Sequence, residues 1–209
     1  MKNIEFVCSG NNGRSPVAEL IATNYLERVG ADREYSATSS GTIVDLIKDG
    51  GFPIKVMTPI IDIAKEREIY SQESLQDIER ALRENDSSTV ERYFREASDV
   101  FMREEAQERG ELLKELGMRG EVKIGRDQTI ARSNTIAILP VDRKNYHAVL
   151  KIYGESGYNP VISIMSVLAT GNPLAEVENA FGLGKNFYRS RIEQLSKEVP
   201  EAVKRIIVA

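Results

Sequence analysis

Short apolar runs alternate along the chain with longer stretches in which apolar residues recur every three or four positions. The runs predict short buried strands, and the spaced stretches predict helices with one apolar face. Strands that alternate with helices form parallel crossover units. The pattern therefore predicts an α/β fold, a doubly wound four-stranded parallel sheet with helices on both faces. The predicted strands are residues 4–7, 35–39, 135–139 and 161–165.

The segment from residue 62 to residue 116 departs from this alternation. It holds 25 charged residues among 55, and 16 of these are acidic. Its apolar residues still recur at helical spacing from Val90 to Phe101, behind a Ser-Thr-Val-Glu capping box at residues 88–91. A shorter helix is predicted to open at Ser74, with a break at residues 85–87. We therefore expect an α/β domain of residues 1–61 and 110–209, interrupted by a helical insertion of residues 62–109.

Candidate chemistry is concentrated at residues 7–16, Val-Cys-Ser-Gly-Asn-Asn-Gly-Arg-Ser-Pro, between the first predicted strand and a helix start. Cys8 is the only cysteine of the chain, and five residues separate it from Arg14. Glycine and asparagine favour a tight loop. Such a loop turns its N–H groups inward beside a helix N-terminus and forms an anion site of phosphate size. The predicted phosphate-binding residues are Ser9, Gly10, Asn11, Asn12, Gly13 and Arg14.

The residue types in this loop suit nucleophilic attack on phosphorus. Oriented N–H dipoles, a helix N-terminus and a nearby guanidinium favour the thiolate of Cys8, which is the nucleophilic form. The planar fork of Arg14 can hold two phosphoryl oxygens at once. Ser15 can donate a hydrogen bond to the sulfur and help it leave in a second step. A buried structural thiol is the alternative for Cys8, but the loop composition favours catalysis.

At these residues the chain resembles the low-molecular-weight protein tyrosine phosphatase family. The resemblance implies that Cys8 is the nucleophile, that Arg14 binds the phosphoryl group, that Asn11 braces the loop and that Ser15 tunes the thiol. The Ser-Ser-Gly-Thr segment at residues 39–42 is similar to a family segment whose first serine, here Ser39, supports the loop asparagine. Residues 141–145, Val-Asp-Arg-Lys-Asn, are similar to the start of a family helix, where Asp142 is a good helix cap.

The chain departs from the family pattern at two positions. A second loop cysteine is replaced by Gly13, so a disulfide relay within the chain is excluded. The family's general acid comes from an Asp-Pro pair before the last helix, and here Asn179 and Ala180 occupy the corresponding positions. An amide cannot donate the proton. Glu178 is the predicted substitute, and its alternative is an ordinary solvated acid. Without a general acid, the rate falls about 100- to 10,000-fold.

Composition narrows the function classes. The net charge of −4 and the lack of basic clusters interleaved with aromatic residues give no reason to expect nucleic acid as a partner. Apolar runs are too short for a membrane span or a secretory signal. One histidine and one cysteine cannot build a zinc site, so we expect no metal and no cofactor. A lone nucleophilic cysteine suits the reducing cytoplasm.

The sequence therefore predicts a cysteine-dependent phosphomonoesterase that acts through a thiophosphate intermediate on a phosphorylated substrate. A phosphotyrosine protein is the substrate that the resemblance implies. The alternative is a phosphate or phosphoprotein binding module that has lost efficient catalysis, which Asn179 favours. The insertion has two open interpretations, a helical cap over the Cys8 pocket and an arm that forms a homodimer.

Overall fold

The computed structural model describes residues 1–125 and 127–208, and its centre is a four-stranded parallel sheet. The strands are β1 (Lys2–Cys8), β2 (Tyr35–Gly41), β3 (Thr135–Pro140) and β4 (Val161–Ile162), in the spatial order β2-β1-β3-β4. In the register, Cys8 lies opposite Gly41 at the carboxyl ends of β1 and β2. The predicted fold class is confirmed. Cys8 lies at the carboxyl end of the strands, where parallel α/β folds bind their ligands.

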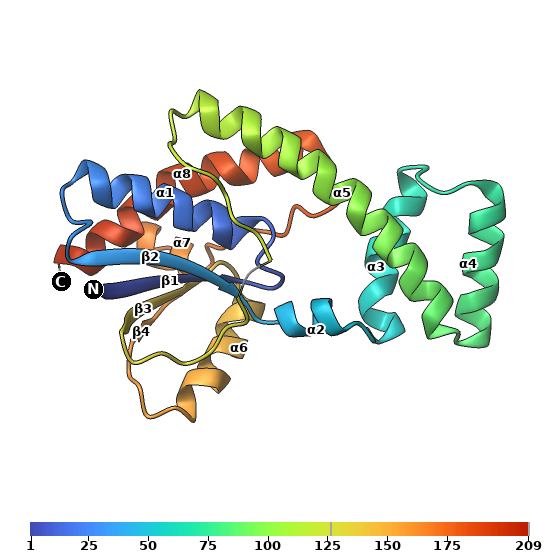
Figure 1. Cartoon of the computed structure of the whole chain (residues 1–209), viewed down its shortest axis with the longest axis horizontal. Coiled ribbons are helices and arrows are strands. Elements are labelled where there is room, and N and C mark those ends of the chain that lie inside the picture. Colours follow the sequence, from blue (N-terminus) through green and yellow to red (C-terminus); the bar gives the residue numbers. More distant parts are fainter. Residues whose placement is uncertain (126, 209) are drawn as a thin grey trace.

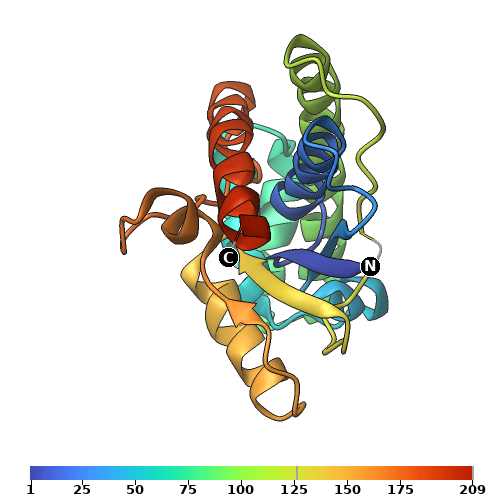
Figure 2. The ribbon, with the colours of Figure 1, turned by 90° about the vertical axis from the view of Figure 1, so that its left-hand side faces the viewer.

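Helices cover both faces of the sheet (Figures 1 and 2). One face carries α1 (Arg14–Arg28), α8 (Lys185–Val208) and the last part of α5 (Ser87–Glu115), and the other face carries α6 (Arg143–Gly154). Side chains of β1 alternate between these faces, since Ile4 and Phe6 join the α1–α8 core and Val7 joins the α6 core. On α8, apolar residues recur at helical spacing and are buried, at Tyr188, Ile192, Leu195 and Val199.

A second hydrophobic core lies outside the sheet domain, to the right in Figure 1. It is formed by α3 (Ile54–Glu66), α4 (Gln72–Glu84) and the first part of α5, and α2 (Val44–Asp49) leads into it. This core begins at Phe52, ahead of the expected boundary at residue 62, and α5 runs through the expected boundary at residue 109 without a break. One helix therefore packs in both cores, and the 62–109 division stays a proposal.

Several predicted element ends differ from the structure. The α5 helix is capped by Asp86, whose side chain accepts from the N–H groups of Ser88 and Thr89, so the predicted capping box at residues 88–91 is wrong. The α4 helix is capped by Ser71 and not opened by Ser74. The predicted strand at residues 161–165 ends at Ile162, and Met165 begins α7 (Met165–Thr170). A short apolar run does not distinguish a strand from a buried helix start.

Within residues 1–125 and 127–208, no helix has the combination of length and apolar character needed to cross a lipid bilayer.

Candidate active site

The loop between β1 and α1 holds Cys8 under a hydroxyl donor. The Cys8 side chain is buried, and its Sγ accepts a hydrogen bond from Ser15 Oγ at 3.0 Å. The same hydroxyl lies 3.1 Å from the backbone carbonyl of Ser40. Because a hydrogen bond to an ionised acceptor is about twice as strong as a neutral one, a thiolate at Cys8 would draw the Ser15 proton to the sulfur.

Asn11 stands at the centre of a buried polar network that fixes the loop. It adopts a left-handed backbone conformation with φ 53°, which asparagine tolerates better than most residues. Its side-chain amide donates to Ser15 Oγ at 3.2 Å and to Ser39 Oγ at 2.9 Å. Ser39 in turn donates to Glu19 Oε2 at 2.6 Å. The network therefore connects the loop, β2 and α1, with Asn11 and Ser39 in contact as the resemblance implies.

Gly41 lets β2 approach the loop closely. A Cβ at this position would lie 2.5 Å from the Ser9 carbonyl oxygen and 2.7 Å from the Asn11 nitrogen, both on the backbone. Those distances are too short for any side chain, so the Ser-Ser-Gly-Thr segment needs glycine here. Beyond it, the N–H groups of Thr42 and Ile43 donate to the carbonyls of Cys8 and Ser9. The end of β2 thereby holds the start of the loop.

Arg14 is oriented by a buried ion pair. Its Nη1 donates to Asp142 Oδ2 at 2.6 Å and to the Val177 carbonyl at 2.7 Å. Asp142 also caps α6 through a bond from the Asn145 N–H, as the sequence predicts. Among the described residues, the hydrogen bonds of Arg14 come from Nη1, which leaves its Nε–Nη2 edge to hold a phosphoryl group. Arg14, which the sequence predicts to bind phosphate, lines the cavity that contains Cys8.

The other predicted loop residues lie at the same place. Ser9 Oγ donates to Asn145 Oδ1 at 3.4 Å. The Asn12 carbonyl accepts from Arg109 at 3.1 Å, and Gly13 lies between α5 and α8. Ser9, Gly10, Asn12, Gly13 and Arg14 line the cavity, whereas Asn11 is fully buried behind it.

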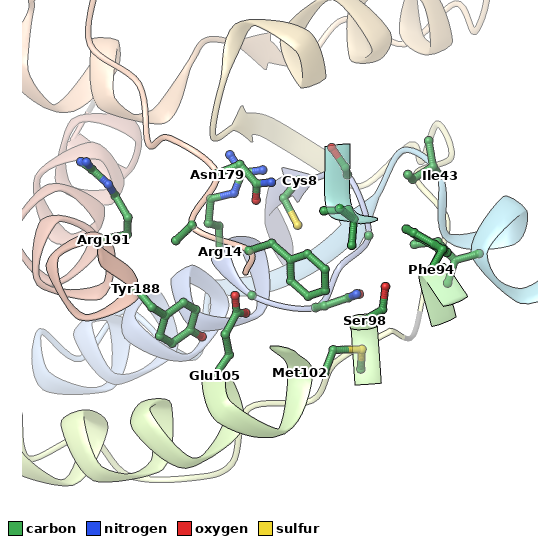
Figure 3. Close-up of a pocket in the computed structure, with 18 of the residues that line it drawn as sticks. Cys8, Arg14, Ile43, Phe94, Ser98, Met102, Glu105, Asn179, Tyr188 and Arg191 are labelled. Carbon is green, nitrogen blue, oxygen red and sulfur yellow. The ribbon is translucent and has the colours of Figure 1, made fainter. Parts of the chain in front are cut away.

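The cavity has a volume of about 390 Å³ and lies between the loop and the inserted helices (Figure 3). Polar loop residues form the end that contains Cys8. The inserted helices and the segments beside them contribute an apolar wall that includes an aromatic pair, Phe52 and Phe94, with ring centroids 5.2 Å apart. The wall residues are Ile43, Ile47, Phe52, Val56, Ile60, Phe94 and Met102. The site thus combines an anion-sized polar end with an apolar wall.

The segment before α8 places Asn179, and not Glu178, at the cavity. Asn179 is among the lining residues. The Glu178 carboxylate instead accepts from Arg191 Nη2 at 2.7 Å, and its side chain is 60% exposed. Figure 3 shows Arg191 pointing away from the Cys8 sulfur. The geometry therefore gives no support to Glu178 as the acid that replaces aspartate.

Glu105, on α5, is a cavity residue that the sequence did not single out among the acidic residues of the central segment. It projects from α5 toward the loop (Figure 3), and one of its oxygens lies 3.6 Å from the position a Cβ of Gly13 would take. Burial raises the pKa of this carboxyl to about 7, although Arg109, a backbone hydrogen bond from Gly182 and Arg14 each lower it. The sequence did carry a signal. Ala97, Phe101 and Glu105 follow one another at four-residue spacing, which places a carboxylate on the buried face of the helix.

Tyr188 completes the wall beside Glu105. Its ring is buried, its hydroxyl accepts from Arg109 at 3.4 Å, and burial raises its pKa to about 12. The phenol is therefore neutral at physiological pH. Within the described parts of the chain, no three histidine, cysteine, aspartate or glutamate side chains are grouped so that they could hold a metal ion.

Comparison with known proteins supports the resemblance that the loop predicts. Residues 3–59 match the family model of low molecular weight phosphotyrosine protein phosphatases, a stretch that includes the Cys8 loop and the Ser-Ser-Gly-Thr segment. No curated protein sequence matches the chain significantly. Both predicted family segments at the N-terminus therefore lie inside the matched region.

Solved structures show the same fold at low sequence identity. A protein tyrosine phosphatase from Entamoeba histolytica superposes with a TM-score of 0.58 at 17% identity, covering 100% of this chain and 97% of that one. A low molecular weight protein tyrosine phosphatase from T. tengcongensis gives 0.55 at 19% identity, covering 98% and 99%. An arginine phosphatase from Geobacillus stearothermophilus gives 0.55 at 13% identity, covering 100% and 94%. The resemblance in fold is confirmed.

Proposed function

We propose that this chain, whose family match and fold support a phosphatase of the protein tyrosine phosphatase type, hydrolyses phosphomonoesters through a covalent intermediate on Cys8. The observation that carries the proposal is the contact of Ser15 Oγ with Cys8 Sγ at 3.0 Å, at the polar end of a cavity that Arg14 also lines. A site for anion binding alone has no use for a thiol held under a hydroxyl donor.

In the first step the Cys8 thiolate attacks phosphorus, and the bond from phosphorus to the leaving oxygen breaks. Negative charge in the transition state lies on the phosphoryl oxygens. The Nε–Nη2 edge of Arg14 binds two of these oxygens, while Asp142 and the Val177 carbonyl fix the orientation of the guanidinium through Nη1. Because the Arg14 guanidinium is oriented before the reaction, it stabilises the transition state without any reorganisation during the step.

In the second step a water molecule attacks phosphorus, and the Cys8 sulfur leaves as a thiolate. Ser15 stabilises that thiolate through the hydrogen bond already present in the structure. Asn11 holds Ser15 in place and is itself held by Ser39. The network therefore acts on the leaving sulfur through the Ser15 hydroxyl. The products are free phosphate and the regenerated enzyme.

The apolar wall of the cavity favours substrates with an apolar group next to the phosphate. Phe94 and Met102 lie on the insertion side, so the insertion acts as a cap for substrate selection. A phosphotyrosine side chain in a protein has the required aromatic group beside its phosphate, and it is the substrate class that the resemblance implies. We place the protein in the cytoplasm, where a nucleophilic cysteine stays reduced. A homodimer through the insertion is the other proposal for these helices.

A phosphate-binding module without efficient turnover is the second candidate. It is favoured by Asn179, an amide that lines the cavity at the position where the family pattern has its acid. This module would bind a phosphorylated protein through the loop and Arg14 without breaking the phosphate ester.

Turnover of p-nitrophenyl phosphate in the presence of a metal chelator distinguishes the two candidates. The phosphatase proposal predicts steady turnover by the wild type and loss of turnover in Cys8→Ser, with phosphate binding retained. Ser190→Ala is a suitable control, because Ser190 lies on α8 outside the cavity. Phosphate binding without turnover in the wild type would support the binding module instead.

A further inference from the structure

The cavity contains a second functional group, which is partly buried and comes from the inserted helix. Glu105 lies on α5 and lines the same cavity as Cys8, Arg14 and Asn179. Figure 3 shows its carboxyl group directed from α5 toward the Cys8 loop. The carboxyl group therefore faces the region where the leaving group of a phosphate ester bound at Cys8 would lie.

The surroundings of Glu105 are those of a proton donor more than those of a structural ion pair. Its Oε1 is buried and has no hydrogen-bond partner among the described residues. The charged and titratable groups that face it are Arg109 and Glu104 on α5, Arg14 at the start of α1 and Tyr188 on α8. Burial outweighs the two arginines and raises its pKa to about 7. Protonated and ionised forms are both populated near neutral pH, as acid–base catalysis requires.

The other carboxyl groups near the site have different positions. Asp142 is held between Arg14 and the first turn of α6, and it does not line the cavity. Glu178 pairs with Arg191 at the surface. Asp99 does line the cavity, six residues before Glu105 on α5, but its side chain is exposed to solvent. Among the residues that the structure describes, Glu105 is thus the carboxyl group at this cavity that has a buried oxygen without a hydrogen-bond partner.

We propose that Glu105, supplied by the helical insertion, is the general acid and base of this enzyme and replaces the acid missing at Asn179. The inference rests on the proposed phosphatase function. In the first step the Glu105 proton passes to the leaving oxygen as the phosphorus–oxygen bond breaks, which gives the alcohol and a Glu105 carboxylate. In the second step that carboxylate takes a proton from the attacking water as the phosphorus–sulfur bond breaks. Each cycle returns Glu105 to its protonated form.

The insertion also holds Glu105 in position. Phe101, one turn earlier on α5, packs edge-to-face on Phe181 with ring centroids 5.7 Å apart. Arg67, directly after α3, donates to the Gly182 carbonyl at 3.1 Å. These contacts fasten the segment before α8 to the inserted helices. The segment that carries the acid in the family pattern therefore serves here as a support for the helix that carries Glu105.

The dependence of rate on the leaving group tests this assignment. A general acid matters little when the leaving group is p-nitrophenolate, a stable anion, and matters greatly when it is phenolate or an alkoxide. We expect Glu105→Gln to lower kcat/KM, which reports the first step alone, by about 100-fold or more for phenyl phosphate and by less than about 10-fold for p-nitrophenyl phosphate. In the wild type, kcat for phenyl phosphate should decrease above pH 7, and in Glu105→Gln this decrease should be absent. Glu105→Asp, with a shorter carboxylic acid, restores part of the rate.

Two control variants separate catalysis from structure. Glu96→Gln makes the same chemical change at an exposed position of α5 outside the cavity, and it should leave both rates unchanged. Glu178→Gln tests the exposed neighbour of Asn179. Equal losses of kcat/KM with both substrates in Glu105→Gln, or the selective loss in Glu178→Gln instead, would overturn the assignment while Cys8-dependent turnover persists. Absence of turnover that depends on Cys8 would overturn the proposed phosphatase function itself.

Discussion

Arg109 on the inserted helix α5 donates a hydrogen bond to the backbone carbonyl of Asn12, 97 residues earlier in the chain, at 3.1 Å. It is one helical turn beyond Glu105, so the two side chains lie on the same face of α5. Arg109 also donates to the Tyr188 hydroxyl and lowers the pKa of Glu105. The insertion thereby holds the loop that carries the nucleophile and sets the protonation of the neighbouring acid.

Replacement of Arg109 by glutamine tests this coupling. The amide keeps hydrogen-bond donors near the Asn12 carbonyl, but it removes the positive charge that stabilises the Glu105 carboxylate. The pKa of Glu105 should rise above about 7, and the midpoint of the decrease in kcat on the alkaline side should move to higher pH by about one unit. The measurement is a kcat–pH profile with phenyl phosphate. A midpoint that stays in place would contradict the coupling.

The raised pKa of Glu105 also predicts how stability depends on pH. Because the folded state holds this proton more tightly than the unfolded state, between about pH 4.5 and 7 the folded state binds more protons, and stability falls as pH rises. Between pH 5 and pH 8, the wild type should lose up to about 3 kcal/mol of unfolding free energy through this group. Glu105→Gln, which has no carboxyl group at this position, should not show this loss. Urea unfolding at the two pH values measures this difference, and an equal response of wild type and Glu105→Gln to pH would contradict it.

Ser15→Ala should slow the release of the sulfur more than its attack. The hydroxyl stabilises the thiolate that leaves in the second step, and a hydrogen bond to a charged group contributes about 1.5–3 kcal/mol, or about 10- to 100-fold in rate. With p-nitrophenyl phosphate, the first turnover should then give a burst of nitrophenol before a slow steady state. Ser39→Ala also loses a hydrogen bond to Asn11 but keeps the contact with sulfur, so it should give no burst. A burst in both variants would show that the Ser15 hydroxyl is not the group that stabilises the leaving thiolate.

Gly182→Ala should weaken the packing of the pre-α8 segment on the insertion. A Cβ here would lie 2.7 Å from Cε2 of Phe101, at a backbone φ of +79°. Strain and crowding together should lower the unfolding free energy by about 2–4 kcal/mol. Gly184→Ala is the control, since its φ is +91° and no atom of the described residues lies within 4 Å of the added Cβ. It should lose only the strain, about 1–2 kcal/mol. Equal losses in the two variants would show that Phe101 makes no difference.

The fold and the loop could be predicted because their signals are local. Apolar runs mark the strands, and the glycine and asparagine residues before Arg14 mark a tight turn beside a helix. The contact of Asn11 with Ser39 also followed from a resemblance carried by short segments. Element ends were less certain, because Asp86 and Ser88 are both good caps and only the folded helix shows which is used.

The acid could not be found in the same way. Glu178 is next to Asn179 in sequence, but the Arg191 guanidinium on α8 holds it at the surface. Glu105 reaches the loop only because α5 continues unbroken from the second core into the first. The spacing of residues in the sequence places the Glu105 carboxylate on the buried face of α5. The surface against which this face packs is decided by tertiary structure and cannot be found from the spacing.

The most direct test of the account is mass spectrometry of the protein quenched in acid during turnover of p-nitrophenyl phosphate. The account predicts one added phosphoryl group, located on Cys8 after digestion, and a larger trapped fraction in Ser15→Ala than in wild type. Turnover with no phosphoryl adduct on Cys8, or turnover that persists in Cys8→Ser, would contradict it.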